Sequence, residues 1–337
     1  MNFVSVGDLS RFFTLRRANS ALRSDIQKLT YEVTTGLKSD IAKHLNGDFL
    51  KLDRLESGIN KADAFRRTTK EAAATAAAMQ TAFGTVANIA ESFSVNMLSD
   101  TSLAVEHTLL KTASVADNHL SAAISALNAN VGGRFVMSGA KVNIPPLINA
   151  DDLVGHAQSV ISGASTTEEA LQRLENWFDA APGGGGFSDI AYRGSHNGGT
   201  HFGIDTSTSI SFEQTANGPG VRSVLLGLTL GALVSRGAFS GDQTAHPAIM
   251  RAGGGHLAKG NSLLTLARAD LGSTEETIER ASVRLDSLST SLKMERANLI
   301  SSDSYEAGSQ LVQAEAAMEA VYAMTVRLSN LSLAKHL

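Results

Sequence analysis

Two apolar stripes at opposite ends of the chain constrain its fold more than any other feature. Across residues 273–337 apolar side chains recur at steps of three and four, which places them on one face of a helix. The members of this stripe that we expect at an interface are Leu311, Met318, Val321, Leu328 and Leu331. A matching stripe near the amino terminus consists of Leu15, Leu22, Ile26, Leu29 and Val33. Because each stripe needs an apolar partner, the two ends predict a helical bundle that closes the chain on itself.

Turn signals set the expected limits of these terminal helices. Gly36 is suited to the left-handed conformation that commonly ends a helix, so the first helix should end there. The carboxy-terminal pattern is interrupted at Ser301–Ser304, and Asp303 followed by Glu306 resembles a capping box that restarts it. The last segment therefore predicts two helices in succession.

The central part of the chain has a different composition. Most of the 30 glycines and all five prolines lie between residues 132 and 260, and short β-type runs alternate with them. The expected fold is mainly α, with long antiparallel helices or a coiled-coil bundle formed by the N- and C-terminal segments, and a central mixed α/β insert domain. The predicted segments are 1–48, an N-terminal assembly helix and connector; 49–131, a long helical hairpin; 132–260, a variable α/β outer insert; and 261–337, a C-terminal helical assembly segment.

Local patterns add detail to this outline. Within the predicted hairpin at 49–131, the first helix should break near residues 99–101 and the next helix should reach Val131. The last helical part of the chain should begin near His256. Thr166 and Glu169 form a capping box that opens a helix over 166–180. The predicted strands are 134–139, 190–193 and 208–212, and the glycine-rich run 182–186 is expected to be a flexible tip.

Composition excludes several classes of function. With 29 basic and 33 acidic residues, a net charge of −4 gives no electrostatic reason to expect nucleic acid as a partner. The chain has no Cys, which excludes disulfides, Cys-ligated zinc and thiol catalysis. The longest apolar run, 224–234, is too short to span a bilayer, so we expect no membrane insertion. The amino terminus lacks the features of a cleaved signal peptide.

A search for catalytic or binding residues finds no convincing set. The run 255–262 has its lysine before the second glycine, so it does not match a phosphate-binding loop. His196 and His201, with Asp189 and Asp205 nearby, offer metal-ligand types, but histidines in a polar glycine-rich loop are more often solvated. We therefore predict no catalytic residues, no cofactor and no metal, and a protein that is not an enzyme.

Three stretches resemble the bacterial flagellin superfamily. They are LTYEVTTGLKSD at 29–40, GGRFVMSG at 132–139, and the carboxy-terminal segment 285–337, which contains ANLISSDSYEAGSQL. The second stretch is similar to the Gly-Arg-Tyr-Leu-Phe-Ser-Gly type element of the members at the hook–filament junction. The chain departs from the family in having no proline between Asp40 and Asp48.

The resemblance implies a structural subunit of the bacterial flagellum that joins hook to filament through coiled-coil packing of its terminal helices. It implies self-association in a ring or tube, contact with a neighbouring hook-associated protein and flagellin, and an export chaperone on the C-terminal segment. It also implies unfolded export through the flagellar type III apparatus, and an extracellular location at the hook–filament junction. The ends would be mobile in the monomer and would become ordered on assembly.

Three alternatives stay open. Within the same family, the alternative is a short flagellin, the subunit of the filament itself. A secreted helical adhesin or translocator would also carry two terminal stripes, paired with each other within one chain, because an intramolecular coiled coil has the same sequence pattern. An enzyme in the middle block is the third alternative.

Overall fold

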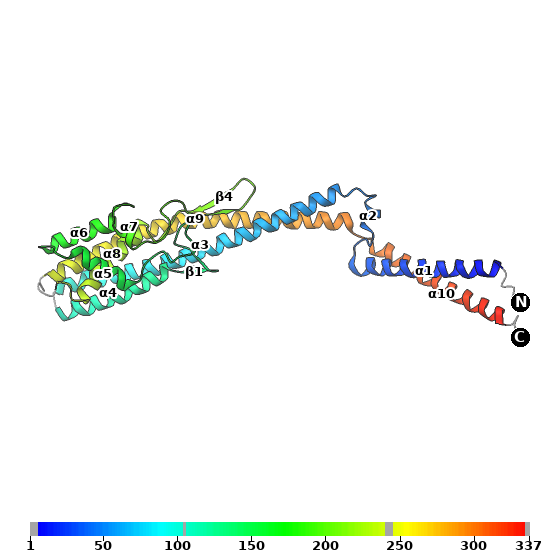
Figure 1. The fold of residues 1–337 in the computed structure, drawn as a ribbon, viewed down its shortest axis with the longest axis horizontal. Coiled ribbons are helices and arrows are strands. Elements are labelled where there is room, and N and C mark those ends of the chain that lie inside the picture. The colour runs from blue at the N-terminus through cyan, green and yellow to red at the C-terminus, as the bar shows by residue number, and fades with distance from the viewer. Residues whose placement is uncertain (1–5, 104–105, 240–244, 334–337) are drawn as a thin grey trace. The chain divides into compact units, whose positions relative to one another are not determined.

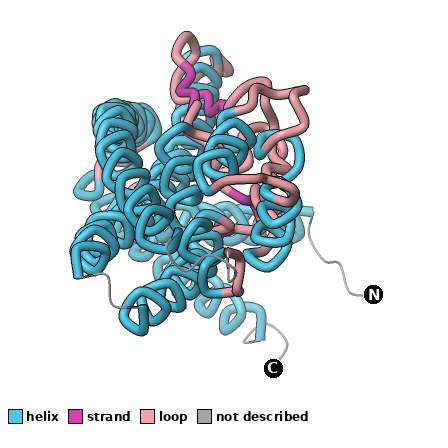
Figure 2. The backbone as a smooth tube through the Cα atoms, turned by 90° about the vertical axis from the view of Figure 1, so that its left-hand side faces the viewer, coloured by secondary structure: helices cyan, strands magenta, loops and turns pink. Residues whose placement is uncertain are grey.

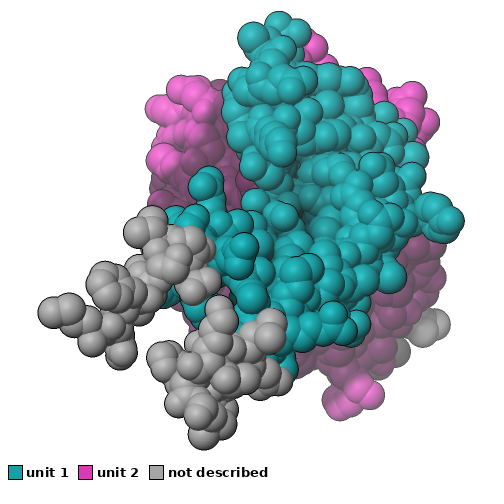
Figure 3. All heavy atoms as spheres, turned by 90° about the vertical axis from the view of Figure 1, so that its right-hand side faces the viewer, with its two compact units in different colours: residues 1–63, 286–337 teal, residues 64–285 magenta. Residues whose placement is uncertain are grey.

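A computed structural model describes residues 6–103, 106–239 and 245–333 of the chain. The chain divides into two compact units, coloured separately in Figure 3: unit 1 is residues 1–63 with 286–337, and unit 2 is residues 64–285. Two helices, α3 (Leu50–Leu103) and α9 (His246–Ile300), contribute residues to both units. Helices dominate the described residues and the strands form two-stranded sheets, which confirms the predicted mainly α fold.

Unit 1 contains two helix pairs. In the first pair, α1 (Val6–Thr35) packs against α10 (Ser304–Leu333), as Figure 1 shows. In the second pair, the start of α3 runs antiparallel to the end of α9, and Glu56 accepts a hydrogen bond from Arg296 at 3.1 Å. The short helix α2 (Ile41–His44) lies between α1 and α3 in the chain. The two predicted terminal stripes are thus on helices that pack together within one chain.

The start of α10 follows the predicted capping only in part. The carboxylate of Asp303 accepts hydrogen bonds from the backbone N–H groups of Tyr305 and Glu306, at 2.8 and 3.1 Å. The side chain of Glu306 accepts from Gln310 one turn further on and does not reach back to complete the box. Asp303 alone is therefore the residue that caps α10.

The main helices of unit 2 are the remainder of α3, α4 (Glu106–Leu127), α8 (Pro219–Ser235) and the first part of α9. Of these, α8 is the buried helix and the others surround it. α3 and α9 lie side by side, where the side chain of Gln80 donates to the carbonyl of Arg268 at 2.9 Å. α8 packs against α4, and nearly all of its residues are buried. The apolar run 224–234 is therefore part of a buried helix of unit 2.

Glycines allow the backbone of α8 to approach its neighbours closely. A Cβ atom added at Gly227 would lie 2.6 Å from the carbonyl oxygen of Gly253 on α9. One added at Gly260 would lie 2.6 Å from Cγ2 of Val224 and 2.9 Å from its backbone nitrogen. Because atoms cannot approach this closely, the positions require glycine, and the glycine-rich run 255–262 belongs to a packed helix.

Shorter elements connect these helices within unit 2. In Figure 2 their strands are magenta and the loops between them are pink. They are β1 (Asn130–Val131), β2 (Arg134–Phe135), α5 (Ala150–Ile161), α6 (Thr167–Asp179), α7 (Phe187–Ile190), β3 (Thr200–Gly203) and β4 (Ser209–Phe212). β1 pairs with β2 and β3 pairs with β4, both antiparallel.

The structure confirms some of the local predictions for this region and corrects others. The predicted strand at 208–212 is confirmed as β4, and the hydroxyl of Thr166 caps α6 by accepting from the N–H of Glu169. The predicted strand at 190–193 is reduced to one bridge: Ile190 ends the helical turn α7, and Tyr192 makes an isolated antiparallel bridge with Leu147. The predicted strand at 134–139 is extended only at its start, and Gly139 has a φ of +61°.

Three predicted helix limits also differ. No break occurs near 99–101, because α3 continues to Leu103 and the hydroxyl of Thr101 bonds to a carbonyl of its own helix. α4 ends at Leu127, before the predicted Val131, and the side-chain amide of Asn128 then pairs with both backbone groups of Leu147. α9 begins at His246, ten residues before the predicted start.

The units also divide the chain differently from the four predicted segments. Unit 2 includes most of the predicted hairpin, the whole predicted insert and the start of the predicted C-terminal segment. The cause is α8, which lies in the predicted insert but buries its side chains among α4 and α9.

Hydrogen bonds hold the run 182–186 in place, in contrast to the flexible tip that its composition predicts. The carboxylate of Asp189 accepts hydrogen bonds from the N–H groups of Gly183 and Gly185 at 2.8 and 2.7 Å. Gly186 lies so close to the carbonyl of Trp177 that a Cβ atom has no room there. Backbone hydrogen bonds from the two glycines hold the pKa of Asp189 below its usual value, so the carboxylate is charged near neutral pH.

Within the described residues, no helix is both long enough and apolar enough to cross a membrane.

The glycine contacts of α9 lead to a matched pair of substitutions. Gly260→Ala should destabilise unit 2 by about 1–3 kcal/mol, because the methyl group overpacks against α8. Gly255→Ala meets no atom within 4 Å on the same helix and should stabilise the protein by about 1 kcal/mol through helix propensity. Urea unfolding of both variants measures the difference, and equal midpoints would contradict the close approach of α8 and α9.

Candidate assembly interface

Most of the predicted interface residues lie between α1 and α10. On α1, Leu15, Leu22, Ile26 and Leu29 are half-buried, whereas Val33 near the end of the helix is exposed. On α10, Met318 is buried, and Leu311, Val321 and Leu328 are half-buried. Leu331 lies outside the residues whose side chains are described. The structure thus brings the two stripes together, and part of each remains accessible.

A polar contact accompanies this apolar packing. The guanidinium of Arg23 on α1 donates a hydrogen bond to the hydroxyl oxygen of Tyr322 on α10 at 2.9 Å. This bond, followed by one to Asn19, holds the pKa of Tyr322 below its usual value. Both partners are exposed, so the contact fixes the register of the two helices more than it stabilises them.

The connectors that follow α1 and α9 pair with each other. The N–H of Lys38 donates to the carbonyl of Ile300 at 2.9 Å, and the N–H of Ser302 donates to the carbonyl of Gly36 at 2.8 Å. Leu37 and Ser301 thereby form an antiparallel bridge. We call this pairing of 36–39 with 300–302 the joint. It bonds together two connectors that are far apart in the sequence.

Glu32, in the last turn of α1, is the polar centre of the joint. Its carboxylate accepts hydrogen bonds from the backbone N–H and the hydroxyl of Ser39, at 3.0 and 2.8 Å, and from the hydroxyl of Ser302 at 2.7 Å. The ammonium of Lys38 lies 3.2 Å away. One buried carboxylate therefore binds the end of α1 to both connectors.

These donors also control the protonation of Glu32. Burial acts to raise the pKa of its carboxyl group, but the hydrogen bonds from Ser39, Ser302 and Lys38 outweigh burial and lower the pKa to about 2. Because the folded pKa lies below the unfolded value, the charged carboxylate stabilises the joint above about pH 4.5. This stabilisation is lost as the pH falls toward 2.

The pair of terminal helices also carries exposed apolar side chains that the sequence analysis did not select. Tyr305, Val312 and Val326 on α10 are 89%, 64% and 59% exposed. With the exposed Ala316 and Ala323, they recur at steps of seven, four, seven and three residues, on the face of α10 opposite the predicted stripe. On α1, Phe12 and Phe13 are also exposed. The heptad-like spacing from Tyr305 was the signal that could have revealed this second face.

The remaining candidates from the sequence do not form a site. His196 and His201 are both exposed, and the ring of His196 lies edge-on to Tyr192. Among the described residues, no group of three or more His, Asp or Glu side chains is placed to hold a metal ion.

Comparison with known proteins gives matches among solved structures. No family model matches the chain, and no curated protein does. The crystal structure of Bacillus cereus FlgL is 13% identical with a TM-score of 0.48, and the alignment covers 72% of this chain and 97% of that one. The structure of a putative flagellar hook-associated protein from Vibrio parahaemolyticus is 12% identical with a TM-score of 0.42, and covers 73% and 99%.

Removing the charge of Glu32 should loosen the joint. Glu32→Gln loses charge-assisted hydrogen bonds worth about 1.5–3 kcal/mol, so the amides of Lys38 and Ser302 should exchange with solvent at least about tenfold faster. Hydrogen exchange at neutral pH measures this.

A matched control for this substitution lies on α10. Glu315 is exposed, so Glu315→Gln removes one charge from the same unit and should leave both exchange rates unchanged. Equal exchange in Glu32→Gln and the unmodified chain would show that the carboxylate does not hold the joint.

Proposed function

We propose that this chain is a non-enzymatic structural subunit of the bacterial flagellum that joins hook to filament. The observation that carries the proposal is the terminal helix pair: α1 and α10 pack together, yet large apolar side chains remain exposed on both helices. Exposed apolar side chains in such a row are typical of a surface that is covered by another molecule. A subunit that assembles through its ends requires such a surface.

The position of the flagellin-like stretches supports the same function. Residues 29–40 form the end of α1 and one side of the joint, and the ANLISSDSYEAGSQL stretch at 297–311 forms the other side. Two of the three stretches that carry the resemblance are therefore in direct contact. The third, at 132–139, contains β2 and the glycines of the turn before it.

In this proposal the two faces of the terminal helices have different roles. The predicted residues that are described between the helices, Leu15, Leu22, Ile26, Leu29, Leu311, Met318, Val321 and Leu328, hold α1 against α10, and their accessible edges contact neighbours. The outer row on α10, from Tyr305 to Val326, packs on the next copy in a ring or tube. Val33 and Leu331 belong to the same assembly surface.

The proposal also covers export and partners. The subunit passes unfolded through the flagellar type III apparatus without a cleaved signal, and an export chaperone covers its C-terminal segment on the way. Outside the cell it contacts a neighbouring hook-associated protein on one side and flagellin on the other. A short flagellin and a secreted helical adhesin are the competing functions, and the pairing of α1 with α10 within one chain is equally compatible with the adhesin.

Labelling intact cells separates these functions. The chain has no Cys, so Thr206→Cys, at the exposed turn between β3 and β4, provides a single attachment point for a maleimide dye. We expect one narrow labelled band where hook meets filament. Label along the whole filament would identify a flagellin, and label spread over the cell body would identify an adhesin.

Charge substitutions on α10 test the division of roles. Val312→Asp lies on the exposed row, so it should leave the thermal melt of the purified chain unchanged and abolish motility. Met318→Asp places a charge in the contact with α1 and should destabilise unit 1 by several kcal/mol, on the order of the cost of burying an unpaired charge.

The control for this pair is the neighbouring exposed residue. Gln313→Asp adds the same charge one position away from the apolar row and should keep both the melt and motility. Full motility in the Val312→Asp strain would exclude the outer row as an assembly surface.

A further inference from the structure

Three Asn-Gly pairs occur in the chain, at residues 46–47, 197–198 and 217–218, and each lies outside the helices and strands. Such pairs deamidate spontaneously, because glycine has no Cβ atom to keep its backbone nitrogen away from the preceding side chain. That nitrogen attacks Cγ of the asparagine, ammonia leaves and a cyclic succinimide forms. Water then opens the ring to aspartate or isoaspartate. The pairs share one local sequence, so only the fold can make their reactions differ.

The first pair is held by the turn that follows α2. The N–H of Gly47 donates to the carbonyl of Ala42 at 2.9 Å, which closes the turn. Asn46 has a φ of +52°, and its own N–H donates to the carbonyl of Lys43 at 3.3 Å. Because the turn must open before the nitrogen of Gly47 can attack, the fold should slow the reaction at this pair.

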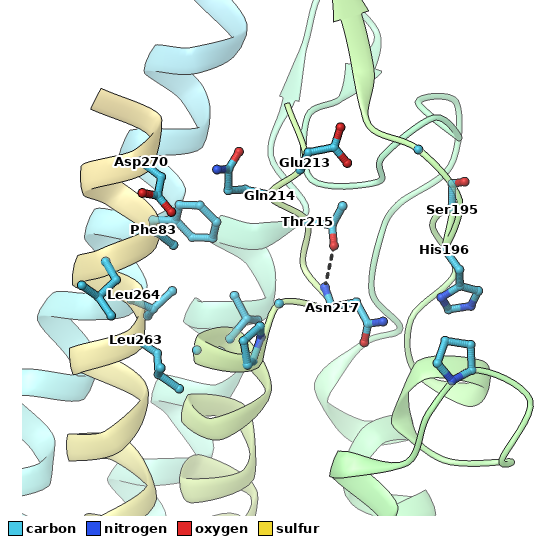
Figure 4. Close-up of a pocket in the computed structure, with 18 residues that line it drawn as sticks. Phe83, Ser195, His196, Glu213, Gln214, Thr215, Asn217, Leu263, Leu264 and Asp270 are labelled. Carbon is cyan, nitrogen blue, oxygen red and sulfur yellow. Dashed lines mark hydrogen bonds between the residues drawn. The ribbon is translucent and has the colours of Figure 1, made fainter. Parts of the chain in front are cut away.

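Hydrogen bonds also hold the pair at 217–218, which lines the cavity of unit 2 in Figure 4. The N–H of Gly218 donates to the carbonyl of Thr215 at 3.1 Å. The N–H of Asn217 donates to the hydroxyl of Thr215, along the dashed line in Figure 4. The side-chain oxygen of Asn217 accepts from the hydroxyl of Ser188 at 3.1 Å. Both the attacking nitrogen and the group that it attacks are therefore held in place.

The pair at 197–198 is different. Asn197 and Gly198 are both exposed, in the loop between α7 and β3. Within the described part of the chain, the N–H of Gly198 and the side-chain amide of Asn197 have no hydrogen-bond partner. Only the backbone of Asn197 is bonded, to the hydroxyl of Ser195. Neither reacting group has to be released from a hydrogen bond before the ring can close.

The ends of this loop are anchored on the residues that follow β2. The N–H of Ser195 donates to the carbonyl of Ser138 at 2.8 Å, and the hydroxyl of Thr200 donates to the carbonyl of Gly139 at 3.1 Å. Isoaspartate at position 197 would lengthen the backbone by a methylene group between these two anchors. The loop could then keep both bonds only by changing its path.

We propose that Asn197 is a site of spontaneous modification in the folded protein. It deamidates through a succinimide to isoaspartate and aspartate, and the isoaspartate loosens the loop from residues 138–139. The amide nitrogen of Asn197 leaves as ammonia, and water supplies the oxygen of the new carboxyl group, so the reaction needs no enzyme. This site is independent of the terminal helices on which the proposed function depends.

The experiment compares the native full chain with the same chain unfolded in guanidinium chloride, both held at mildly alkaline pH. Cleavage after Lys, Arg and Glu places the three pairs on separate peptides, 44–51, 194–213 and 214–222, for mass spectrometry. In the unfolded chain the three asparagines should react at similar rates. In the native chain Asn197 should keep close to its unfolded rate, whereas Asn46 and Asn217 should react at least about fivefold more slowly, because a hydrogen bond must first break.

Two further measurements test the product and its effect. Asn197→Gln should remove the product from peptide 194–213 and leave the other two rates unchanged, because its longer side chain closes the ring far more slowly. In the aged native chain the amide of Ser195 should exchange with solvent faster than in fresh protein. Equal protection of all three asparagines by folding, or a product without isoaspartate, would overturn the proposed site. Unchanged exchange at Ser195 would overturn the loosening of the loop.

Discussion

The close approach of small side chains is the constraint on which unit 2 depends. Aromatic residues are only 5% of the sequence, so few large rings are available to fill space between long helices. The core uses alanines such as Ala76, Ala90, Ala113 and Ala116, all at 0% exposure, and glycines at the contacts of α8. Short side chains bring helix backbones near enough for many dispersion contacts, each individually small. The helix α8 can be buried almost completely because its neighbours leave this room.

Unit 1 is organised on a different principle. Its helices are largely exposed, and the contact between α1 and α10 buries few residues completely. Where α1 ends and α10 begins, the joint holds the chain in place instead. There, backbone hydrogen bonds and the Glu32 carboxylate join the two connectors. A polar joint of this kind fixes local geometry without a large core.

The sequence predicted the periodic parts of the structure and missed what depends on contacts between distant residues. The mainly α fold, the cap of α6 and β4 are confirmed, because each has a local pattern. The Glu32 carboxylate was missed, since one Glu in a helical pattern gives no sign that Ser39 and Ser302 will donate to it. Of the strand predicted at 190–193 only Tyr192 pairs, with Leu147, because Ile190 belongs to the helical turn that Phe187 begins. The run 182–186 was called flexible from composition, although Asp189 binds it.

The two apolar faces of α10 explain why the sequence alone could not separate an intramolecular from an intermolecular coiled coil. A helix that binds only its own chain needs one apolar face and gains solubility from a polar opposite face. α10 has one face against α1, where Met318 is buried, and a second, from Tyr305 to Val326, with no described residue covering it. The pairing with α1 therefore accounts for the first face alone. The second face is what a helix pair needs if it is to become one layer of a larger assembly.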